Sequence, residues 1–407
     1  MSRIDELIGE HCPNGVEHRT LGDIARLVRG NGMPRKDLTA SGVGAIHYGD
    51  IYTRYGLWTT ETLYFVSREN AERLARVDPG DLIVTNTSEN LDDVGKAVAW
   101  LGKESIVTGG HATVLKHDQD AKFLAYWFSA RSFDQQKRSL AGGTKVIDIS
   151  AKKLAKLRVP IPPLTVQREI VRVLDDFAEL EGELEAELRM ELEARHQQLS
   201  SYRTRLLDPD DDVPVVELGR VAEFKYGHTA KAAATGTHRF LRITDITSRG
   251  KLSSENAKYV DYSDPSHRFI VEAGDLLVAR TGGTYGKTML VDAVDPAVYA
   301  SFLIRIRFPD KSISPAYYWH FAQSRSYWDQ ANALVSTGGQ PQFNANVLKL
   351  VRVPIPLPSE QERIVRILDR FDALVNDLSI DLRGEIAARR KQYEYFRDQL
   401  LTFEETR

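Results

Sequence analysis

The chain has 407 residues, of which 42% are hydrophobic and 27% charged, and its formal net charge is −3. This length is enough for two or three domains with cores of their own. The near-neutral charge argues against a nucleic-acid binder that works alone. One cysteine, Cys12, excludes an intrachain disulfide and any cysteine-based zinc site. The first residues lack a secretory-signal pattern, and no apolar stretch approaches the roughly 20 residues that cross a bilayer, so we expect a cytoplasmic protein.

The first half of the chain begins with a short N-terminal lead, residues 1–20, and continues as a mixed domain over residues 21–158. Short apolar runs such as Leu82–Thr85 alternate with glycine-rich turns and predict strands. The aromatic run Phe123–Phe128 predicts a helix. This alternation is typical of a domain that mixes helices and strands.

A second domain over residues 214–352 follows the same plan. The motif Gly80-Asp81-Leu82 of the first domain has its counterpart in Gly274-Asp275-Leu276, and Gly95-Lys96 has its counterpart in Gly286-Lys287. The two domains share this skeleton and little else. The sequence therefore predicts one ancestral fold that occurs twice with different side chains.

The strongest repeat lies in the two segments that follow these domains, residues 159–213 and 353–407. Residues 159–207 and 353–401 are identical at 22 of 49 positions without a gap. Both open with Val-Pro-Ile-Pro, which cannot be helical because proline removes an amide and forces its predecessor into extended geometry. We infer that the chain arose by tandem duplication.

Each repeated segment then predicts one long helix of about 40 residues, or about 60 Å. Thr165 and Ser359, each followed by an amide or carboxylate in the first turn, predict the N-caps. Apolar residues recur every three or four positions, and such a stripe needs a partner stripe. We expect the two helices to form an antiparallel coiled coil through Ile170, Leu174, Phe177, Leu184, Leu188, Leu192, Ile364, Leu368, Phe371, Leu378, Leu382 and Ile386.

Catalytic motifs are missing from this framework. The loop Gly282–Lys287 is similar to a phosphate-binding loop, but the first glycine of that motif would fall on Thr281. Neither an H-E-x-x-H metal motif nor a G-x-S-x-G nucleophile motif is present. The sequence favours a protein without catalysis of its own. Two alternatives stay open, a phosphate-binding enzyme that uses the Gly282–Lys287 loop and a purely structural coiled-coil adaptor.

Two dissimilar domains, each followed by the same helical segment, resemble the specificity (S) subunits of type I restriction–modification systems. The resemblance covers essentially the whole chain. It is carried by Val159-Pro160-Ile161-Pro162 with Gln167, Ile170 and Val171, and by Val353-Pro354-Ile355-Pro356 with Gln361, Ile364 and Val365. The first copy departs at Val166 and Arg168, where the family usually has acidic residues, a change that an amphipathic helix tolerates.

This resemblance implies an α+β fold with two target-recognition domains and a pseudo-twofold internal repeat, joined by two long antiparallel helices. Each domain would read one half of a split, asymmetric site on double-stranded DNA, and the helix pair would set the gap between the halves. Two methyltransferase (M) subunits and two restriction (R) subunits would be partners, and no membrane would be involved. S-adenosylmethionine, ATP and magnesium would belong to those partners, so the chain itself would carry no catalytic, cofactor or metal site. A further alternative is the specificity subunit of a system whose methyltransferase and nuclease are fused.

Base reading requires Arg, Lys, Asn, Gln, Ser or Thr side chains on loops that reach the edges of a groove. Three polar clusters in each domain meet this requirement. In the first domain the candidates are Arg29, Asn31, Arg35, Lys36, Asn86, Thr87, Ser88, Thr144 and Lys145. In the second they are Lys225, His228, Lys231, Arg280, Thr281, Thr284, Tyr285, Lys287, Gln340, Gln342 and Asn344.

Overall fold

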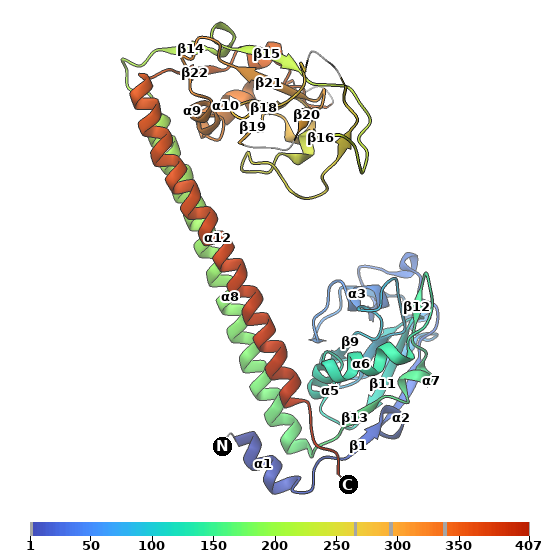
Figure 1. Cartoon of the computed structure of the whole chain (residues 1–407). Helices are drawn as coiled ribbons and strands as arrows, with labels where there is room; N and C mark the ends of the chain where they lie inside the picture. The colour runs from blue at the N-terminus through green and yellow to red at the C-terminus, as the bar shows by residue number, and fades with distance from the viewer. Residues whose placement is uncertain (1–2, 264–266, 293–295, 337–339, 407) are drawn as a thin grey trace. The chain divides into compact units, whose positions relative to one another are not determined.

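A computed structural model describes residues 3–263, 267–292, 296–336 and 340–406 (Figure 1). The chain divides into two compact units. Unit 1 comprises residues 1–186 and 384–407, and unit 2 comprises residues 187–383. The long helices α8 (Leu164–Leu207) and α12 (Pro358–Leu400) each contribute residues to both units. Each unit therefore contains one mixed domain together with part of both helices.

The domain of unit 1 contains two main sheets. Its five-stranded sheet has the order β2 (Ala25–Arg29), β11 (Ala112–His117), β7 (Leu82–Thr85), β9 (Ala97–Trp100) and β4 (Trp58–Thr59). The four-stranded sheet has the order β5 (Tyr64–Val66), β3 (Val43–Ile46), β10 (Ile106–Thr108) and β6 (Ala75–Val77). Most neighbours are antiparallel, while β4 with β9 and β3 with β10 are parallel. Two short pairs complete the domain, β1 (His18–Thr20) with β13 (Arg158–Pro160) and β8 (Thr87–Ser88) with β12 (Ile147–Asp148).

The helices of unit 1 supply most of its aromatic core. The predicted helix is α5 (Ala121–Trp127), and it buries Phe123, Tyr126 and Trp127 completely. The shorter elements are α1 (Arg3–His11), α2 (Leu21–Ile24), η1 (Arg35–Asp37), α3 (Tyr48–Ile51), α4 (Arg68–Ala71), α6 (Arg131–Leu140) and α7 (Ala151–Leu154). The core of this domain extends into the first turns of α8, because Ile170 and Leu174 belong to the same hydrophobic cluster as these aromatic rings.

Unit 2 has the same plan with fewer strands. One sheet has the order β15 (Glu223–Tyr226), β21 (Leu303–Arg307), β18 (Leu276–Ala279) and β19 (Thr288–Leu290). A second has the order β17 (Tyr259–Val260), β16 (His238–Leu241) and β20 (Ala297–Tyr299), and β14 (Val215–Glu217) pairs with β22 (Arg352–Pro354). The helical elements are η2 (Leu218–Arg220), η3 (Ile243–Asp245), η4 (Gly282–Thr284), α9 (Pro315–Phe321), α10 (Arg325–Leu334) and α11 (Ala345–Leu348).

Both domains contain the glycine–aspartate turn that the sequence analysis singled out. Gly80 and Gly274 adopt positive φ angles of 94° and 89°, a conformation that costs glycine little because it has no Cβ. In each turn the aspartate accepts a hydrogen bond from the N–H three residues before it, at 2.7 Å for Asp81 and 3.0 Å for Asp275. The duplicated motif thus builds the same turn before the same buried strand.

The predicted helix caps are wrong by two residues, because the residues that precede the helices are Pro163 and Leu357. α8 begins at Leu164 and α12 at Pro358, so Thr165 and Ser359 lie inside the first helical turn. Pro358 suits the first position of a helix because its missing N–H would have no partner there. The extended backbone of the preceding Val-Pro segments forms β13 and β22, as the prolines predict.

A buried glutamine in the first turn fastens each long helix to its own domain. Oε1 of Gln167 accepts from the N–H of Asp120 at 3.0 Å, and Nε2 donates to the carbonyl of Pro162 at 2.7 Å. Gln361 repeats this arrangement in unit 2, where it accepts from the N–H of Ser314 at 2.8 Å. The two side chains are 0% and 2% exposed. Their amides link helix and domain and do not serve as caps.

The ends of the long helices pack in antiparallel fashion within each unit. In unit 1 the ring of Phe177 stacks on Phe396 with centroids 5.8 Å apart, and Arg390 lies 2.9 Å from the carboxylate of Glu185. Leu401, just past the end of α12, joins the hydrophobic cluster that contains the start of α8. The start of one helix therefore packs beside the end of the other.

In unit 2 the two helices exchange roles, so that the end of α8 packs beside the start of α12. The ring of Tyr202 on α8 stacks on Phe371 of α12 with centroids 4.9 Å apart. Leu207, the last residue of α8, lies in the same cluster as Ile364 and Leu368 near the start of α12. These contacts confirm the predicted antiparallel coiled coil and the α+β fold.

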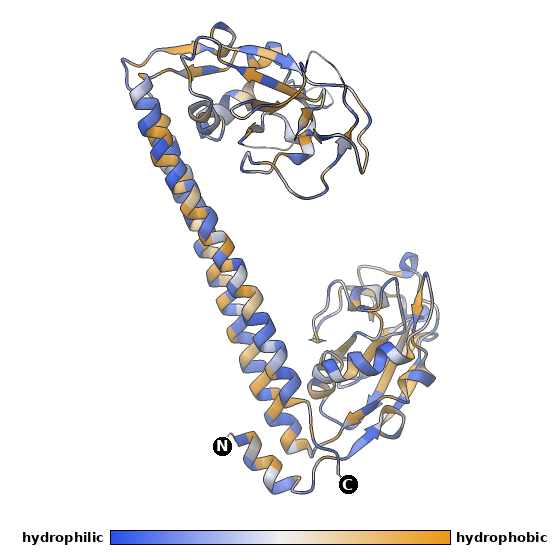
Figure 2. Ribbon diagram, in the orientation of Figure 1, coloured by the Kyte–Doolittle hydropathy of each residue, from blue (hydrophilic) through white to orange (hydrophobic). Residues whose placement is uncertain are grey.

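The predicted packing residues of the two helices are mostly sheltered from solvent, and Figure 2 shows hydrophobic residues recurring along both helices. Those that are buried are Ile170, Leu174, Ile364, Leu368 and Leu382. Those that are half-buried are Leu184, Leu188, Leu192, Phe371, Leu378 and Ile386, whereas Phe177 is 41% exposed beside its stacking partner. Among the helices of the described residues, we find none long and apolar enough to span a bilayer.

The segment around Val16 and the C-terminal tail lie against each other in unit 1. Val16 forms a parallel bridge with Glu405, and Arg158 pairs with the same glutamate side chain. Helix α1 packs near the start of α8 (Figure 1), where Ile4 is 5% exposed within the domain core and Arg3 lies 3.8 Å from Glu169. Both ends of the chain thus help to build the same unit.

Candidate nucleic-acid interface

In unit 2, the three predicted polar clusters meet where strand β18 ends. The N–H of Arg280 donates to the carbonyl of Phe302 at 3.0 Å, and the Arg280 carbonyl accepts from the N–H of Phe343 at 2.7 Å. The cluster around His228 lies beside them, because the His228 carbonyl accepts from the N–H of Ser301 at 2.9 Å. Loops that are distant in sequence therefore form one tip.

Unit 1 brings its clusters together through the same backbone bonds. The N–H of Asn86 donates to the carbonyl of His111 at 2.7 Å, and the Asn86 carbonyl accepts from the N–H of Ile149 at 2.8 Å. Asn31 forms a bridge with Gly109 on the neighbouring strand connection. The tip of unit 1 is thus the structural counterpart of the tip of unit 2, with position 86 in the place of position 280.

Several candidates of unit 1 already have structural partners. Asn86 is 2% exposed; its amide donates to the carbonyl of Ile149 at 2.7 Å and its side-chain oxygen accepts from the hydroxyl of Thr113 at 2.8 Å. The amide of Asn31 donates to the carbonyl of Arg73 at 2.7 Å. Ser88 is 6% exposed within the short β8 strand. These side chains hold the loops in place and are the weakest base-reading candidates.

The same holds for three candidates of unit 2. Thr281 is 4% exposed and accepts from the amide of Gln342 at 3.1 Å. The hydroxyl of Tyr285 donates to the side chain of Asn332 at 2.8 Å. Asn344 is the N-cap of α11, where its side-chain oxygen accepts from two backbone N–H groups at 3.0 and 3.2 Å. A sequence pattern cannot show whether a polar side chain is hydrogen-bonded within the protein or free to bind DNA.

The other candidates are exposed or half-buried. Three of the half-buried ones bond within the protein: Thr87 to His111, Thr284 to the carbonyl of Thr281, and Gln342 to the hydroxyl of Thr281. The exposed ones are Arg29, Arg35, Lys36, Thr144, Lys145, Lys225, Lys231 and Gln340. The half-buried ones are Thr87, His228, Arg280, Thr284, Lys287 and Gln342. Arg35 also has a protein partner, since its Nη2 lies 3.3 Å from the buried carboxylate of Asp50. The DNA contacts of all these residues stay predictions.

The rings of His47, Tyr48 and His111 in unit 1 and of Phe302 in unit 2 were not among the candidates from the sequence. At the tip of unit 1, the ring of Tyr48 lies 4.6 Å from His47 and 5.0 Å from His111, and Nδ1 of His111 is 2.9 Å from the hydroxyl of Thr87. Burial lowers the pKa of His47, so its imidazole is neutral at pH 7. At the tip of unit 2 the rings of Tyr226 and Phe302 are 42% and 51% exposed. An aromatic residue in an apolar run predicts core, so only its exposure in the fold distinguishes it.

The Gly282–Lys287 loop does not have the structural context of a phosphate-binding loop. It connects the antiparallel strands β18 and β19, whereas a phosphate-binding loop leads from a strand into a helix. Its backbone amides are also used within the protein: those of Gly282, Tyr285, Gly286 and Lys287 all donate to protein carbonyls. The loop is a tight turn, and the phosphate-binding alternative loses its structural basis.

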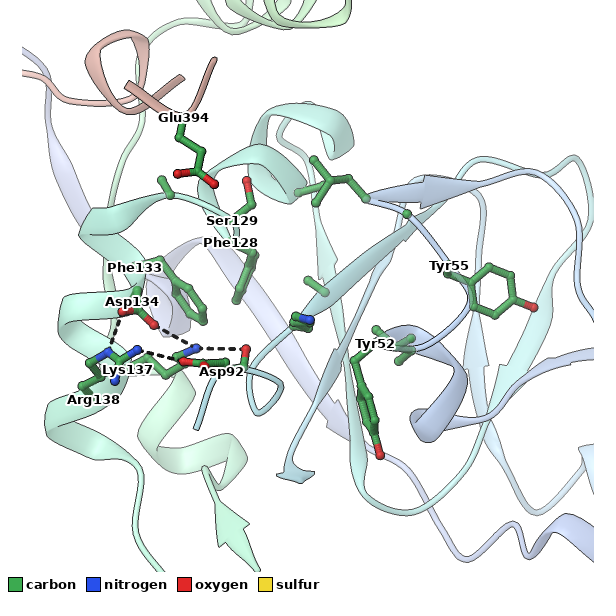
Figure 3. Close-up of a pocket in the computed structure, with 17 residues that line it drawn as sticks. Tyr52, Tyr55, Asp92, Phe128, Ser129, Phe133, Asp134, Lys137, Arg138 and Glu394 are labelled. Carbon is green, nitrogen blue, oxygen red and sulfur yellow. Dashed lines mark hydrogen bonds and ion pairs between the residues drawn. The ribbon is translucent and has the colours of Figure 1, made fainter. Parts of the chain in front are cut away.

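A cavity of about 580 Å³ lies in unit 1 (Figure 3), and none of the predicted contact residues lines it. It is lined by the rings of Tyr52, Tyr55, Phe128 and Phe133 and by charged residues that include Glu394 of α12. Most of those charges are neutralised: Asp134 lies 3.0 Å from Lys137 and 2.6 Å from Arg138, and Arg138 lies 2.9 Å from Asp92. Paired charges of this kind stabilise the domain and offer little to a ligand. Within the part of the chain that the structure describes, no group of three side chains could hold a metal ion.

The duplicated domains, polar tips and paired helices together define a DNA-specificity protein built from two recognition modules. A family model, the type I restriction modification DNA specificity domain, matches residues 13–194 and again residues 210–387. The two matches cover most of the chain. The chain therefore belongs to the family of type I restriction–modification specificity subunits, which recognise DNA sequence through two such domains.

Relatives from bacteria and archaea resemble the chain over nearly its full length. The specificity subunit of the type I restriction enzyme EcoR124I/EcoR124II from Escherichia coli is 28% identical over 404 residues, covering 95% of this chain and 94% of that protein. The MjaVIII specificity subunit from Methanocaldococcus jannaschii is 22% identical over 395 residues, covering 91% and 89%.

Solved structures share the fold. A chain from a study of complex assembly and conformational transition of the type I restriction–modification system superposes with a TM-score of 0.71 at 15% identity, covering 96% of this chain and 98% of that chain. The HsdS subunit from Thermoanaerobacter tengcongensis gives a TM-score of 0.53 at 15% identity, covering 96% and 97%. The arrangement of elements is thus preserved where most side chains have changed.

Proposed function

We propose that the chain is the non-catalytic specificity subunit of its complex and reads an asymmetric, bipartite DNA site. The observation that carries this proposal is the pair of tips. Asn86 and Arg280 occupy equivalent backbone positions, yet one is buried and neutral and the other is half-buried and charged. Two modules on one frame with different reading groups suit two different half-sites, since base readout depends on side chains at groove edges.

The partners follow from the family and from the charge of the chain. Methyltransferase and restriction subunits act with type I specificity subunits, and we propose two of each for this complex. A net charge of −3 leaves much of the phosphate neutralisation to those partners. S-adenosylmethionine, ATP and magnesium would be held by the partners, and the assembly would work in the cytoplasm, where its DNA is.

The helix pair supports a proposed role in spacing. Buried glutamines, Gln167 and Gln361, fasten the start of each helix to one domain, and aromatic stacking joins the helices within each unit. Because each domain is fastened to the helix pair, the distance between the domains would depend on the length of the helices. We therefore expect the number of unspecified base pairs between the half-sites to depend on helix length.

Methylation sequencing tests the proposed function directly. The chain is co-expressed with its methyltransferase subunit in cells that lack other adenine methylation, and the methyltransferase alone serves as the control. We expect methylated adenines in one bipartite, non-palindromic motif that disappears without this chain. A genome with no motif that depends on the chain would contradict the proposal. Co-purification of one polypeptide with both methyltransferase and nuclease activity would instead assign the fused system.

A further inference from the structure

We propose that Arg280 reads a guanine in the half-site recognised by unit 2, with Tyr226 and Phe302 as the positioning residues that hold its guanidinium. The proposal rests on the proposed function of the chain and names the base that one tip recognises. It is carried by the backbone anchoring of Arg280, by the two rings that flank its side chain, and by the lack of an acidic partner for it among the residues that the structure describes.

The backbone of Arg280 is held on both sides. Its N–H donates to the carbonyl of Phe302 at 3.0 Å, and its carbonyl accepts from the N–H of Phe343 at 2.7 Å. The residue directly follows strand β18, whose four residues are all buried. A side chain on such an anchored backbone starts from a fixed point, which lowers the entropy lost on binding.

The guanidinium is held at one nitrogen and is free at the other two. Nε of Arg280 donates to the carbonyl of Ser301 at 3.0 Å. The central carbon of the guanidinium lies 5.3 Å from the ring centroid of Tyr226 and 5.2 Å from that of Phe302, both within the range of cation–π attraction. Across residues 3–263, 267–292, 296–336 and 340–406, no carboxylate pairs with Arg280 and no acceptor binds Nη1 or Nη2.

The two flanking rings are unusual for their exposure. Phe302 lies in the turn that connects β20 and β21 and is 51% exposed, although a phenylalanine ring is most often buried. Tyr226 is 42% exposed, and its hydroxyl accepts from the N–H of Ala345 at 3.0 Å, which fixes its ring. Exposed rings beside an unpaired arginine are typical of a surface that is covered when a partner binds.

An arginine with two free terminal amino groups matches guanine better than any other base. In the major groove guanine presents the acceptors O6 and N7, and a guanidinium donates to both at once. Lysine carries the same charge and can also donate to guanine, but it lacks the planar fork of arginine, so we expect its contact to be weaker. The geometry of Arg280 therefore supplies base recognition in addition to attraction for the phosphates.

Unit 1 has the same backbone hydrogen bonds at its tip but no arginine at the equivalent position. The equivalent of Arg280 is Asn86, which is 2% exposed and satisfied by Ile149 and Thr113. His111 stands in the place of Phe302, because its carbonyl accepts from the N–H of Asn86. We therefore expect guanine recognition at this position in the half-site of unit 2 and not in that of unit 1.

The test uses the chain assembled with its methyltransferase subunits and a duplex that contains the methylated motif. Each guanine of the unit 2 half-site is replaced in turn by 7-deazaguanine, which lacks the N7 acceptor. We expect one such replacement to weaken binding at fixed salt toward the lower end of the roughly 5- to 150-fold range of a bidentate base contact, because the O6 acceptor remains. Arg280→Ala should cause a larger loss, because both hydrogen bonds disappear, and in that variant the same replacement should have no further effect.

Three further variants separate base reading from charge and from misfolding. Arg280→Lys should bind more weakly than the wild type but more tightly than Arg280→Ala, because the charge and a donor remain while the planar fork is lost. Phe302→Leu should weaken binding to the normal duplex, because the ring that flanks the guanidinium is lost. The loss should be smaller than for Arg280→Ala, because leucine keeps the apolar bulk. Arg325→Ala removes an equal charge from an exposed residue of α10 outside the tip, and it should leave binding unchanged.

Two results would overturn the inference. One is a half-site in which 7-deazaguanine has no effect at any guanine. The other is an Arg280→Ala variant whose affinity falls by the same factor for every DNA sequence and depends less on salt. That is the behaviour of a phosphate contact. Either result leaves site-specific binding of the wild-type complex intact. A complex that recognises no motif at all would instead contradict the proposed function.

Discussion

Units 1 and 2 share the hydrogen bonds that shape their turns and fasten their helices, and they differ in the side chains at their surfaces. Gly80-Asp81 and Gly274-Asp275 form the same turn, and Gln167 and Gln361 make the same buried bonds. The tips differ in charge, exposure and aromatic content: Asn86 is buried and neutral, whereas Arg280 is half-buried, charged and flanked by two exposed rings. The comparison teaches that the side chains at the loop ends can change while the hydrogen bonds that shape the loops remain.

A second difference lies at the starts of the long helices. In unit 1, Val166 is fully buried in the cluster that also contains Ile4 of helix α1. The equivalent residue in unit 2 is Glu360, which is partly exposed and lies 2.6 Å from Arg363. Apolar residues occur where an N-terminal helix covers the surface, and an ion pair occurs where the surface meets water.

Exchange of the unit 2 domain is the largest change that can test this comparison. Residues 214–352 are replaced by the corresponding domain of a specificity subunit with a different motif. Because the frame is shared and the tips are not, we expect a completely different second half-site and an unchanged first half-site. Methylation sequencing measures both halves at once. A change in both halves would mean that the two units do not read independently.

Lengthening the helix pair tests whether spacing is a property of the shared frame. Seven residues are inserted after Gly182 in α8 and seven after Lys391 in α12, which lie at matching levels according to the Phe177–Phe396 contact. One heptad preserves the apolar stripe and adds about 10 Å to the pair. We expect the same half-sites with a longer spacer in the methylated motif. An unchanged spacer would restrict the helices to a docking role.

A matched pair of substitutions tests the difference at the helix starts. Val166→Glu places a carboxylate in the core under α1 and should destabilise the protein by several kcal/mol, because a buried charge without a partner is costly. Glu360→Val removes only an exposed ion pair and should change stability by less than about 1 kcal/mol. Thermal unfolding of the assembled complex provides the measurement. Equal effects would show that α1 does not seal this surface.

The smallest expected difference concerns pH. His320 of unit 2 is 0% exposed and its Nε2 lies 2.9 Å from Asp369, while the equivalent residue of unit 1 is Tyr126, whose hydroxyl donates to Asp175 at 2.8 Å. Burial lowers the pKa of His320, so the unfolded chain binds a proton that the folded chain excludes. Stability from neutral His320 is thus present above about pH 6.5 and falls below it.

Acid titration of stability checks this asymmetry. A single histidine accounts for at most about 1.4 kcal/mol per pH unit, so unit 2 should weaken modestly between neutral pH and pH 5. The pKa of Asp369 is also lowered, chiefly by the hydrogen bond from His320, but its loss of stability begins only below about pH 4. His320→Gln retains a donor and should remove the dependence near pH 6. Hydrogen exchange can follow each unit separately, and an unaltered slope in the variant would exclude His320 as its source.

Much of the fold could be predicted because its signals are local and repeated. The prolines before Leu164 and Pro358 require extended backbone, and the recurrence of leucines requires a helix with an apolar stripe. The helix starts were predicted two residues too late, since α12 begins at a proline and α8 begins directly after one, and neither uses its Thr or Ser as a cap. The role of Gln167 was also missed, because its partner Asp120 is 47 positions away.

The candidate site was only partly accessible in this way. Polar clusters correctly indicated the loops that meet at each tip, but the fates of individual side chains depend on neighbours that are distant in sequence. Asn86 and Arg280 both follow a buried strand and both are good hydrogen-bonding residues, yet Thr113 engages one and two exposed rings flank the other. Phe302 gave no signal, because aromatic residues usually lie in the core.

The sequence by itself determined the duplication, the two long helices and the family to which the chain belongs, because these depend on spacing and periodicity along the chain. Only the tertiary structure decided which loops converge, which polar groups are satisfied inside the protein, and which remain available for DNA. The physical reason is that a hydrogen-bond donor is free or engaged according to atoms within about 3 Å of it, and most of those atoms come from other parts of the chain.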